Sequence, residues 1–363
     1  MSLPSTPLVA LPSLLRQAEA LPQGAALRAK RLGLWHQLGW REFARQVHHA
    51  ARGWAALGVT PRDTIALVGA LGPAFVATLY AAQALGVTVE VAGLQAEPAL
   101  LATARFVLAD SGHDLERVLR DAGSALQAAV VADATAQAGS ALPHGAQLRS
   151  FDELLRLGAQ ADVPPLPAST AAVTAVRVHD RGQVRELAAP RVPASHAAVR
   201  VGEPGRVFAD VPPDWLPGWA WLLSDWPHSG LTLVLPEPGG DAGSDRREAA
   251  ARYWLAAPAR VLAVAETLQR RTPRSGLAAR ALRAALSGER HPLARWARRR
   301  IAAGLGLAHT RRLIGEAAAD APAYAVLAAL GIAVPGAKAA PSTPEDDAAQ
   351  VAAGQLAFAG GTP

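Results

Sequence analysis

The chain has 363 residues, half of them hydrophobic, which is enough for two lobes of ordinary domain size with a sizeable core and excludes global disorder. It has no cysteine, which excludes disulfides and thiolate metal sites and fits a reducing cytoplasm, and its first residues lack the basic start and long apolar run of a secretory signal. The net charge of +6 does not indicate a nucleic-acid-binding protein, because the basic residues are mostly arginines scattered among 30 carboxylates.

The first part of the chain alternates between helical and strand patterns. A helix is expected over residues 40–57, up to Gly58, and an uncharged stretch follows between Asp63 and Glu90. Glycines and a proline interrupt that stretch near its start, which excludes a membrane-spanning helix of about 20 apolar residues. We therefore predict a buried β–α–β unit with a strand at 64–68, a helix at 74–85 and a strand at 87–91.

The alternation continues with a strand at 105–109, a helix at 115–121, a strand at 128–132 and a helix at 151–157. This order predicts an α/β fold with mostly parallel sheets covered by helices on both faces. The proline-rich segment 162–167 breaks regular structure and marks a boundary between a first lobe, residues 1–165, and a second lobe, residues 166–335. Residues 336–363 are rich in alanine, glycine and proline and are expected to form a disordered tail.

Tryptophans gather in one short segment of the second lobe. Trp215, Trp219 and Trp226 are spaced by four and seven residues, which on a helix would build one aromatic face, although Pro217 and Pro227 restrict where that helix can run. Two interpretations stay open. The cluster is either core packing between the lobes or the lining of a pocket for an apolar ligand.

Arginines are densest between Arg290 and Arg312. The spacing predicts one helix with an exposed arginine face and with Leu293, Trp296 and Ile301 on its buried side. Docking of this face to an anionic membrane surface is the weaker alternative to an ordinary solvated surface.

Four stretches carry a resemblance to a known family. They are residues 29–69, residues 208–218, residues 253–261, and Gly315-Glu316-Ala317 followed by Leu330-Gly331-Ile332. In their order and spacing they resemble the long-chain-type acyl-CoA synthetases of the AMP-binding, adenylate-forming family. The resemblance implies the two-lobed large N-terminal domain of these enzymes without their small C-terminal domain. It also implies an acyl-binding role for Trp215, Gly218 and Trp219, and adenine binding at Gly315, Glu316 and Ala317.

Three features on which the family relies are missing. A phosphate loop needs small residues whose backbone N–H groups can surround the anion, whereas the segment Arg177–Glu186 is bulky and charged. The family's Tyr-Gly-x-Thr-Glu motif, whose glutamate holds magnesium, is replaced by Ala333-Val334-Pro335. The chain ends before the family's catalytic lysine would occur, and its only lysines are Lys30 and Lys338.

These departures favour a degenerate acyl-CoA synthetase-like protein that is catalytically inactive and binds a partner protein, such as an intact synthetase, or an apolar fatty-acyl ligand. We expect no catalytic residue, no metal ligand, no cofactor, no nucleic acid and no transmembrane segment. The alternative is a divergent ATP-dependent fatty acid or carboxylate–CoA ligase that uses ATP and magnesium and is completed in trans by another chain. Whether the protein is an enzyme therefore stays open.

Overall fold

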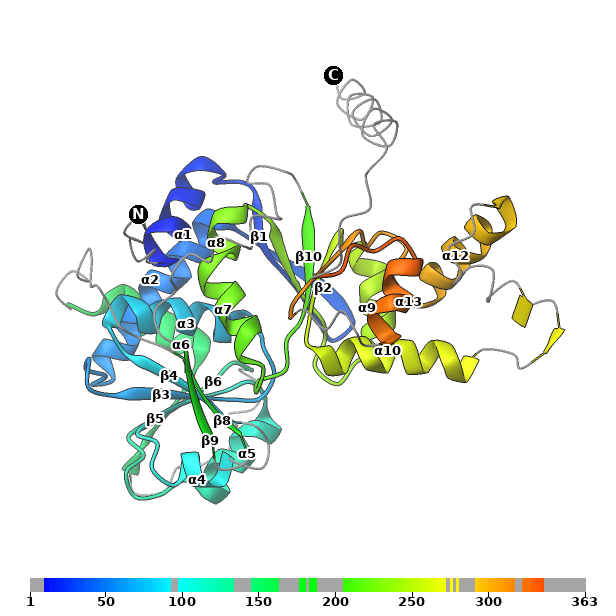
Figure 1. Ribbon diagram of the computed structural model, residues 1–363. Coiled ribbons are helices and arrows are strands. Elements are labelled where there is room, and N and C mark those ends of the chain that lie inside the picture. The colour runs from blue at the N-terminus through cyan, green and yellow to red at the C-terminus, as the bar shows by residue number, and fades with distance from the viewer. Residues whose placement is uncertain are drawn as a thin grey trace, which may run out of the picture.

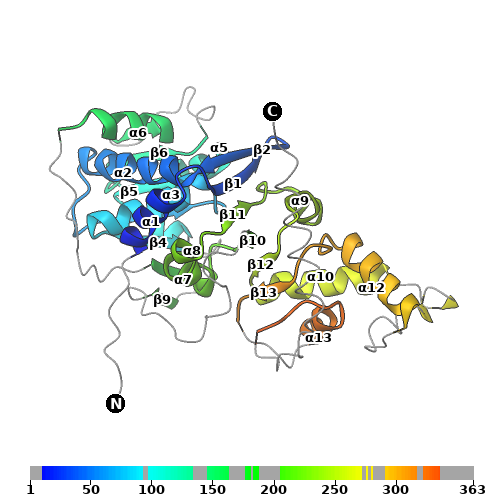
Figure 2. The same ribbon diagram turned by 90° about the horizontal axis from the view of Figure 1, so that it is seen from above.

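The computed structural model describes residues 10–92, 97–133, 145–162, 176–180, 183–187, 205–271, 275–276, 279–280, 291–316 and 322–335. Its strands form two largely parallel sheets flanked by helices, which confirms the predicted α/β class (Figures 1 and 2). The first sheet has seven strands in the order β7 (Gln147–Ser150), β6 (Ala128–Val131), β5 (Phe106–Ala109), β3 (Thr64–Val68), β4 (Thr88–Ala92), β8 (Val176–Asp180) and β9 (Gln183–Leu187). The second sheet has six, in the order β13 (Arg312–Ile314), β12 (Tyr253–Ala256), β10 (Arg206–Asp210), β11 (Thr232–Leu235), β1 (Ala25–Arg31) and β2 (Leu34–Gly39).

Helices connect and cover these strands. In chain order they are α1 (Ala10–Ala20), α2 (Trp40–Ala56), α3 (Pro73–Leu85), α4 (Glu97–Leu101), α5 (Gly112–Asp121), α6 (Phe151–Gln160), α7 (Leu216–Ser224), α8 (Trp226–Ser229), α9 (Ala242–Ala249), α10 (Pro258–Arg271), α12 (Pro292–Gly304) and α13 (Pro322–Ala329). Among these described helices, none combines the length and the hydropathy that crossing a membrane requires.

Each sheet contains strands from both the earlier and the later part of the chain. Strand β1 pairs in parallel with β11, with Leu27 opposite Leu233, so an N-terminal segment lies in the second sheet. Strand β8 pairs in parallel with β4, with Val176 opposite Val89, so a later segment lies in the first sheet. The strands thus cross the predicted boundary at residue 165 in both directions. Residues 163–167 of the predicted boundary segment, and the predicted tail 336–363, lie outside the described residues.

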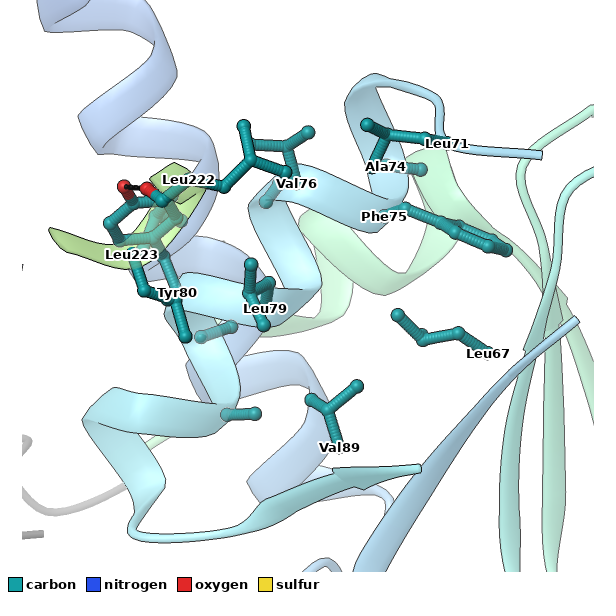
Figure 3. Close-up of a cluster of buried hydrophobic side chains, with 14 of the residues drawn as sticks. Leu67, Leu71, Ala74, Phe75, Val76, Leu79, Tyr80, Val89, Leu222 and Leu223 are labelled. Atoms are coloured by element: carbon teal, nitrogen blue, oxygen red, sulfur yellow. Dashed lines mark hydrogen bonds between the residues drawn. The ribbon is translucent and has the colours of Figure 1, made fainter. Parts of the chain in front are cut away.

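One core joins the sheets. It contains side chains from both sheets and from α1, α2, α3, α6, α7 and α8. Helix α3 is mostly apolar and is buried from Ala74 to Ala84, as expected of a helix that is covered all round. Figure 3 shows Phe75, Leu79 and Tyr80 of this helix with Leu67 and Val89 of the sheet. The Tyr80 hydroxyl donates a hydrogen bond of 2.7 Å to the buried carbonyl of Leu222, which ties α3 to α7.

A second core covers the opposite face of the second sheet and contains side chains of α10, α12 and α13. The predicted orientation of α12 is wrong for its two largest apolar residues. Leu293 is 69% exposed and Trp296 is 64% exposed, whereas Ala294, Ala297 and Ala302 face inward. The helix packs through its alanines because small side chains allow a close approach to the core. Ile301, the third residue predicted to face inward, is half-buried and packs against this core.

Candidate functional site

The strand order of the second sheet reverses between β10 and β12. The chain adds β11 on one side of β10 and then returns to place β12 on the other side. In parallel α/β sheets, ligands bind outside the carboxyl ends of the strands at such a reversal. The predicted site residues follow the carboxyl ends of two strands here, with Trp215 after β10 and Gly315 and Glu316 directly after β13.

The Trp215 indole lies between the two predicted groups of site residues. Its N–H donates a hydrogen bond of 3.3 Å to a carboxylate oxygen of Glu316. A Cβ added at Gly218 would lie 2.6 Å from the indole ring, and one added at Gly315 would lie 3.6 Å from the ring and 2.8 Å from the Ala256 carbonyl oxygen. Glycine at position 218 therefore makes room for the indole, whereas glycine at position 315 makes room for the Ala256 carbonyl. The structure brings Trp215, Gly218, Gly315 and Glu316 together, whereas Ala317 lies outside the described residues.

The other tryptophans of the segment serve the core. Trp219 is 1% exposed and donates its indole N–H to the Pro213 carbonyl. Trp226 is fully buried and its ring centroid lies 5.1 Å from that of Trp40. A single aromatic helix face does not form, because α7 ends at Ser224 and Trp226 begins α8. Trp215 alone of the three predicted tryptophans borders Glu316 at the strand edge.

A buried charge cluster lies at the same edge and was not predicted from the sequence. Asp210 ends β10, and its carboxylate lies 3.1 Å from Arg260 Nε and 3.7 Å from an Arg246 Nη. Burial raises the pKa of Asp210, and the charges of the two arginines oppose that rise. Arg246 is itself buried, its guanidinium carbon 5.0 Å from the centroid of the Trp254 ring, and burial lowers its pKa. Asp210 is therefore committed to two guanidinium groups, while the Arg260 side chain stays half-exposed.

The segment expected in place of a phosphate loop forms a pair of antiparallel strands. Strands β8 and β9 pair antiparallel, with Arg177 opposite Glu186 and Asp180 opposite Gln183. Arg177 Nε lies 2.7 Å from Glu186, its Nη1 lies 3.2 Å from Glu90, and both hydrogen bonds raise its pKa. From the same hairpin Arg185 donates a hydrogen bond of 3.0 Å to the Asp214 carbonyl, next to Trp215.

These residues do not fit a magnesium nucleotide. A triphosphate needs several converging N–H donors, and the Arg177 guanidinium is already bound to two carboxylates. Within the part of the chain that the structure describes, no three His, Asp or Glu side chains are grouped to hold a metal ion.

The first sheet has its own reversal, between β3 and β5. Gly69 follows β3 with φ of +112°, and a Cβ there would lie 2.7 Å from the Cβ of Asp110, the residue that follows β5. A Cβ on Gly72 would lie 3.0 Å from Asp110 Oδ1. Burial, reinforced by the nearby charge of Asp114, raises the pKa of Asp110 to about 7. Sequence reasoning missed Asp110 because one aspartate after an apolar strand is a common pattern.

The fold is that of the adenylation domains of adenylate-forming enzymes. The adenylation domain of a carboxylate reductase from Mycobacterium chelonae superposes with a TM-score of 0.65 at 16% identity, over 90% of this chain and 57% of that one. The corresponding domain from Segniliparus rugosus, in complex with AMP and a co-purified carboxylic acid, gives 0.64 at 14% identity, over 90% and 59%. A protein assigned as a long-chain-fatty-acid CoA ligase from Rhodopseudomonas palustris gives 0.60 at 15% identity, over 90% and 74%.

The chain therefore spans a little over half the length of the two reductase domains. The sequence matches no protein-family profile and no curated protein sequence. The likeness to the adenylation domains confirms the fold that the resemblance implied.

Proposed function

We propose that this protein is a non-catalytic relative of the adenylate-forming enzymes, and that it binds the apolar acyl part of a carboxylic acid without activating it. The observation that carries the proposal is the β8–β9 hairpin. Its antiparallel strands and the paired Arg177 stand where the resemblance places a phosphate loop.

Adenylate formation depends on the neutralisation of negative charge. Attack of a carboxylate on the α-phosphate of ATP brings negative groups together, and enzymes accelerate such steps by positioning and by neutralising charge with placed cations and N–H donors. At the hairpin the Arg177 guanidinium donates hydrogen bonds to Glu90 and Glu186 and is paired with both carboxylates. At the edge of the second sheet, Asp210 holds Arg260 and Arg246. The arginines Arg177, Arg246 and Arg260 are thus already paired with carboxylates and are not free to neutralise a triphosphate.

An acyl ligand fits the surroundings of Trp215 better. The indole is 7% exposed, belongs to the apolar core and is fixed at its edge by a single long hydrogen bond to the exposed Glu316. A small movement of this ring would open apolar surface between Gly218 and Gly315.

Medium- or long-chain fatty acids are expected to change tryptophan fluorescence and to raise the melting temperature of the wild-type protein. A ligand that binds only the folded state must stabilise it. The Trp215→Phe variant should lose most of the fluorescence response, while Trp296→Phe, which alters an exposed tryptophan on α12, should keep it. If no acid shifts either signal in the wild type, the acyl part of the proposal is wrong, and a protein partner becomes the ligand to seek.

The non-catalytic part is tested separately by ATP–pyrophosphate exchange, with the fatty acids used for binding as substrates. We expect no exchange above the rate without protein. Exchange that appears only when a second chain is added would support the divergent ligase completed in trans.

A further inference from the structure

Helix α12 presents its large side chains to solvent. Leu293 and Trp296 are three residues apart and both are more than 60% exposed, and no other exposed large apolar residue of the described chain is a tryptophan. The buried side of the helix is made by Ala294, Ala297 and Ala302. Figure 1 shows α12 beyond α10 and α13, on the side of the second sheet that faces away from the first sheet.

The same face is strongly basic. Arg295, Arg299 and Arg300 are exposed and lie within one turn of Trp296 along the helix. No acidic residue occurs between Pro292 and Gly304. None of these three arginines forms a salt bridge with a residue that the structure describes, in contrast to Arg177, Arg246 and Arg260.

The combination of large apolar side chains and arginines on one face distinguishes between the possible anionic partners. A nucleic acid would use the three arginines but would gain little from Leu293. The interface of an anionic bilayer uses both kinds of side chain, since tryptophan settles at the level of the headgroups and leucine enters the acyl boundary. Arginine stems lie along this boundary while their guanidinium groups reach the phosphates. The net charge of +6 also favours the approach of the protein to an anionic bilayer.

We propose that the α12 face formed by Leu293, Trp296, Arg295, Arg299 and Arg300 docks the protein peripherally on membranes that contain anionic lipids. Two apolar side chains and three charges give a reversible contact that weakens with salt. The proposal does not depend on acyl binding at Trp215, because the two surfaces lie on different elements.

The test is co-sedimentation of the full chain with vesicles of phosphatidylcholine alone or with 30% phosphatidylserine. We expect binding only to the anionic vesicles, and a fall in the bound fraction when the salt concentration is raised. The triple variant Arg295→Gln, Arg299→Gln, Arg300→Gln should lower the partition coefficient at least tenfold, and Trp296→Ala should lower it severalfold.

The matched control replaces three exposed arginines on other elements, Arg41→Gln, Arg62→Gln and Arg120→Gln, and removes the same charge. Circular dichroism establishes that every variant is folded. The proposal is overturned if the wild type does not bind anionic vesicles, or if the control triple loses as much binding as the α12 triple. Binding of a duplex DNA or RNA that is lost in the α12 triple, without vesicle binding, would assign the face to nucleic acid instead.

Discussion

Gly158→Ala is expected to lower the free energy of unfolding by about 3 kcal/mol, among the largest effects of any single methyl group in this protein. Helices α2 and α6 approach each other closely through Gly53 and Gly158. A Cβ on Gly158 would overlap the backbone oxygen of His49 and lie 2.7 Å from the Gly53 amide nitrogen. These are backbone atoms, so the clash cannot be relieved by a change of rotamer, and the two helices must move apart.

The measurement is urea unfolding of Gly158→Ala beside Gly304→Ala. Gly304 ends α12, and a Cβ there would meet no atom within 4 Å, so this control should be neutral or slightly stabilising. Equal effects of the two substitutions would contradict the close approach of α2 and α6 at Gly158.

Asp110→Asn is expected to stabilise the protein at alkaline pH. The folded protein holds the proton of Asp110 up to about pH 7, because burial and the nearby Asp114 disfavour the charge, whereas the unfolded chain releases it near the ordinary value of 3.8. The stability due to the protonated carboxyl is therefore fully present below about pH 4 and is lost as the pH rises towards 7. At about 1.4 kcal/mol per pKa unit, the loss is bounded at about 4 kcal/mol.

Asparagine resembles the protonated acid at every pH. The free energy of unfolding of the variant, relative to that of the wild type, should therefore be about 2 kcal/mol higher at pH 8.5 than at pH 4.5. Urea midpoints at the two pH values measure this difference. The exposed Asp162→Asn is the matched control and should show no such dependence. A gain for Asp110→Asn that is the same at both pH values would contradict the raised pKa.

Local patterns predicted the elements of the first sheet well. The strand at 64–68 has the predicted bounds, and α2 and α3 agree with their predicted ranges to within a residue at either end. These predictions succeeded because apolar periodicity, glycines and prolines determine the bounds of an element within a few residues of sequence. The pairing of β1 with β11 and of β8 with β4 was not predictable, because it depends on contacts between segments far apart in the chain.

Side-chain size misled the prediction for α12. Leu293 and Trp296 were assigned to the core as the largest apolar residues of the helix, but the alanine face packs inward. At the candidate site, the resemblance singled out Trp215, Gly218, Gly315 and Glu316, and the structure adds a hydrogen bond between Trp215 and Glu316. The ion pairs of Asp210 escaped prediction because Arg246 and Arg260 are distant in sequence and reach it only in the folded sheet.

We proposed above that this protein has the fold of an adenylation domain but does not form acyl-adenylates. ATP–pyrophosphate exchange with a panel of carboxylic acids, from acetate to long-chain fatty acids and aromatic acids, tests this most directly. Exchange reports acyl-adenylate formation itself and does not require a later acceptor. We predict no exchange above background with any acid, including acids that change the fluorescence of Trp215. Exchange that survives repeated purification, with the rate following this protein through each step, would contradict the claim and show that the β8–β9 hairpin supports catalysis.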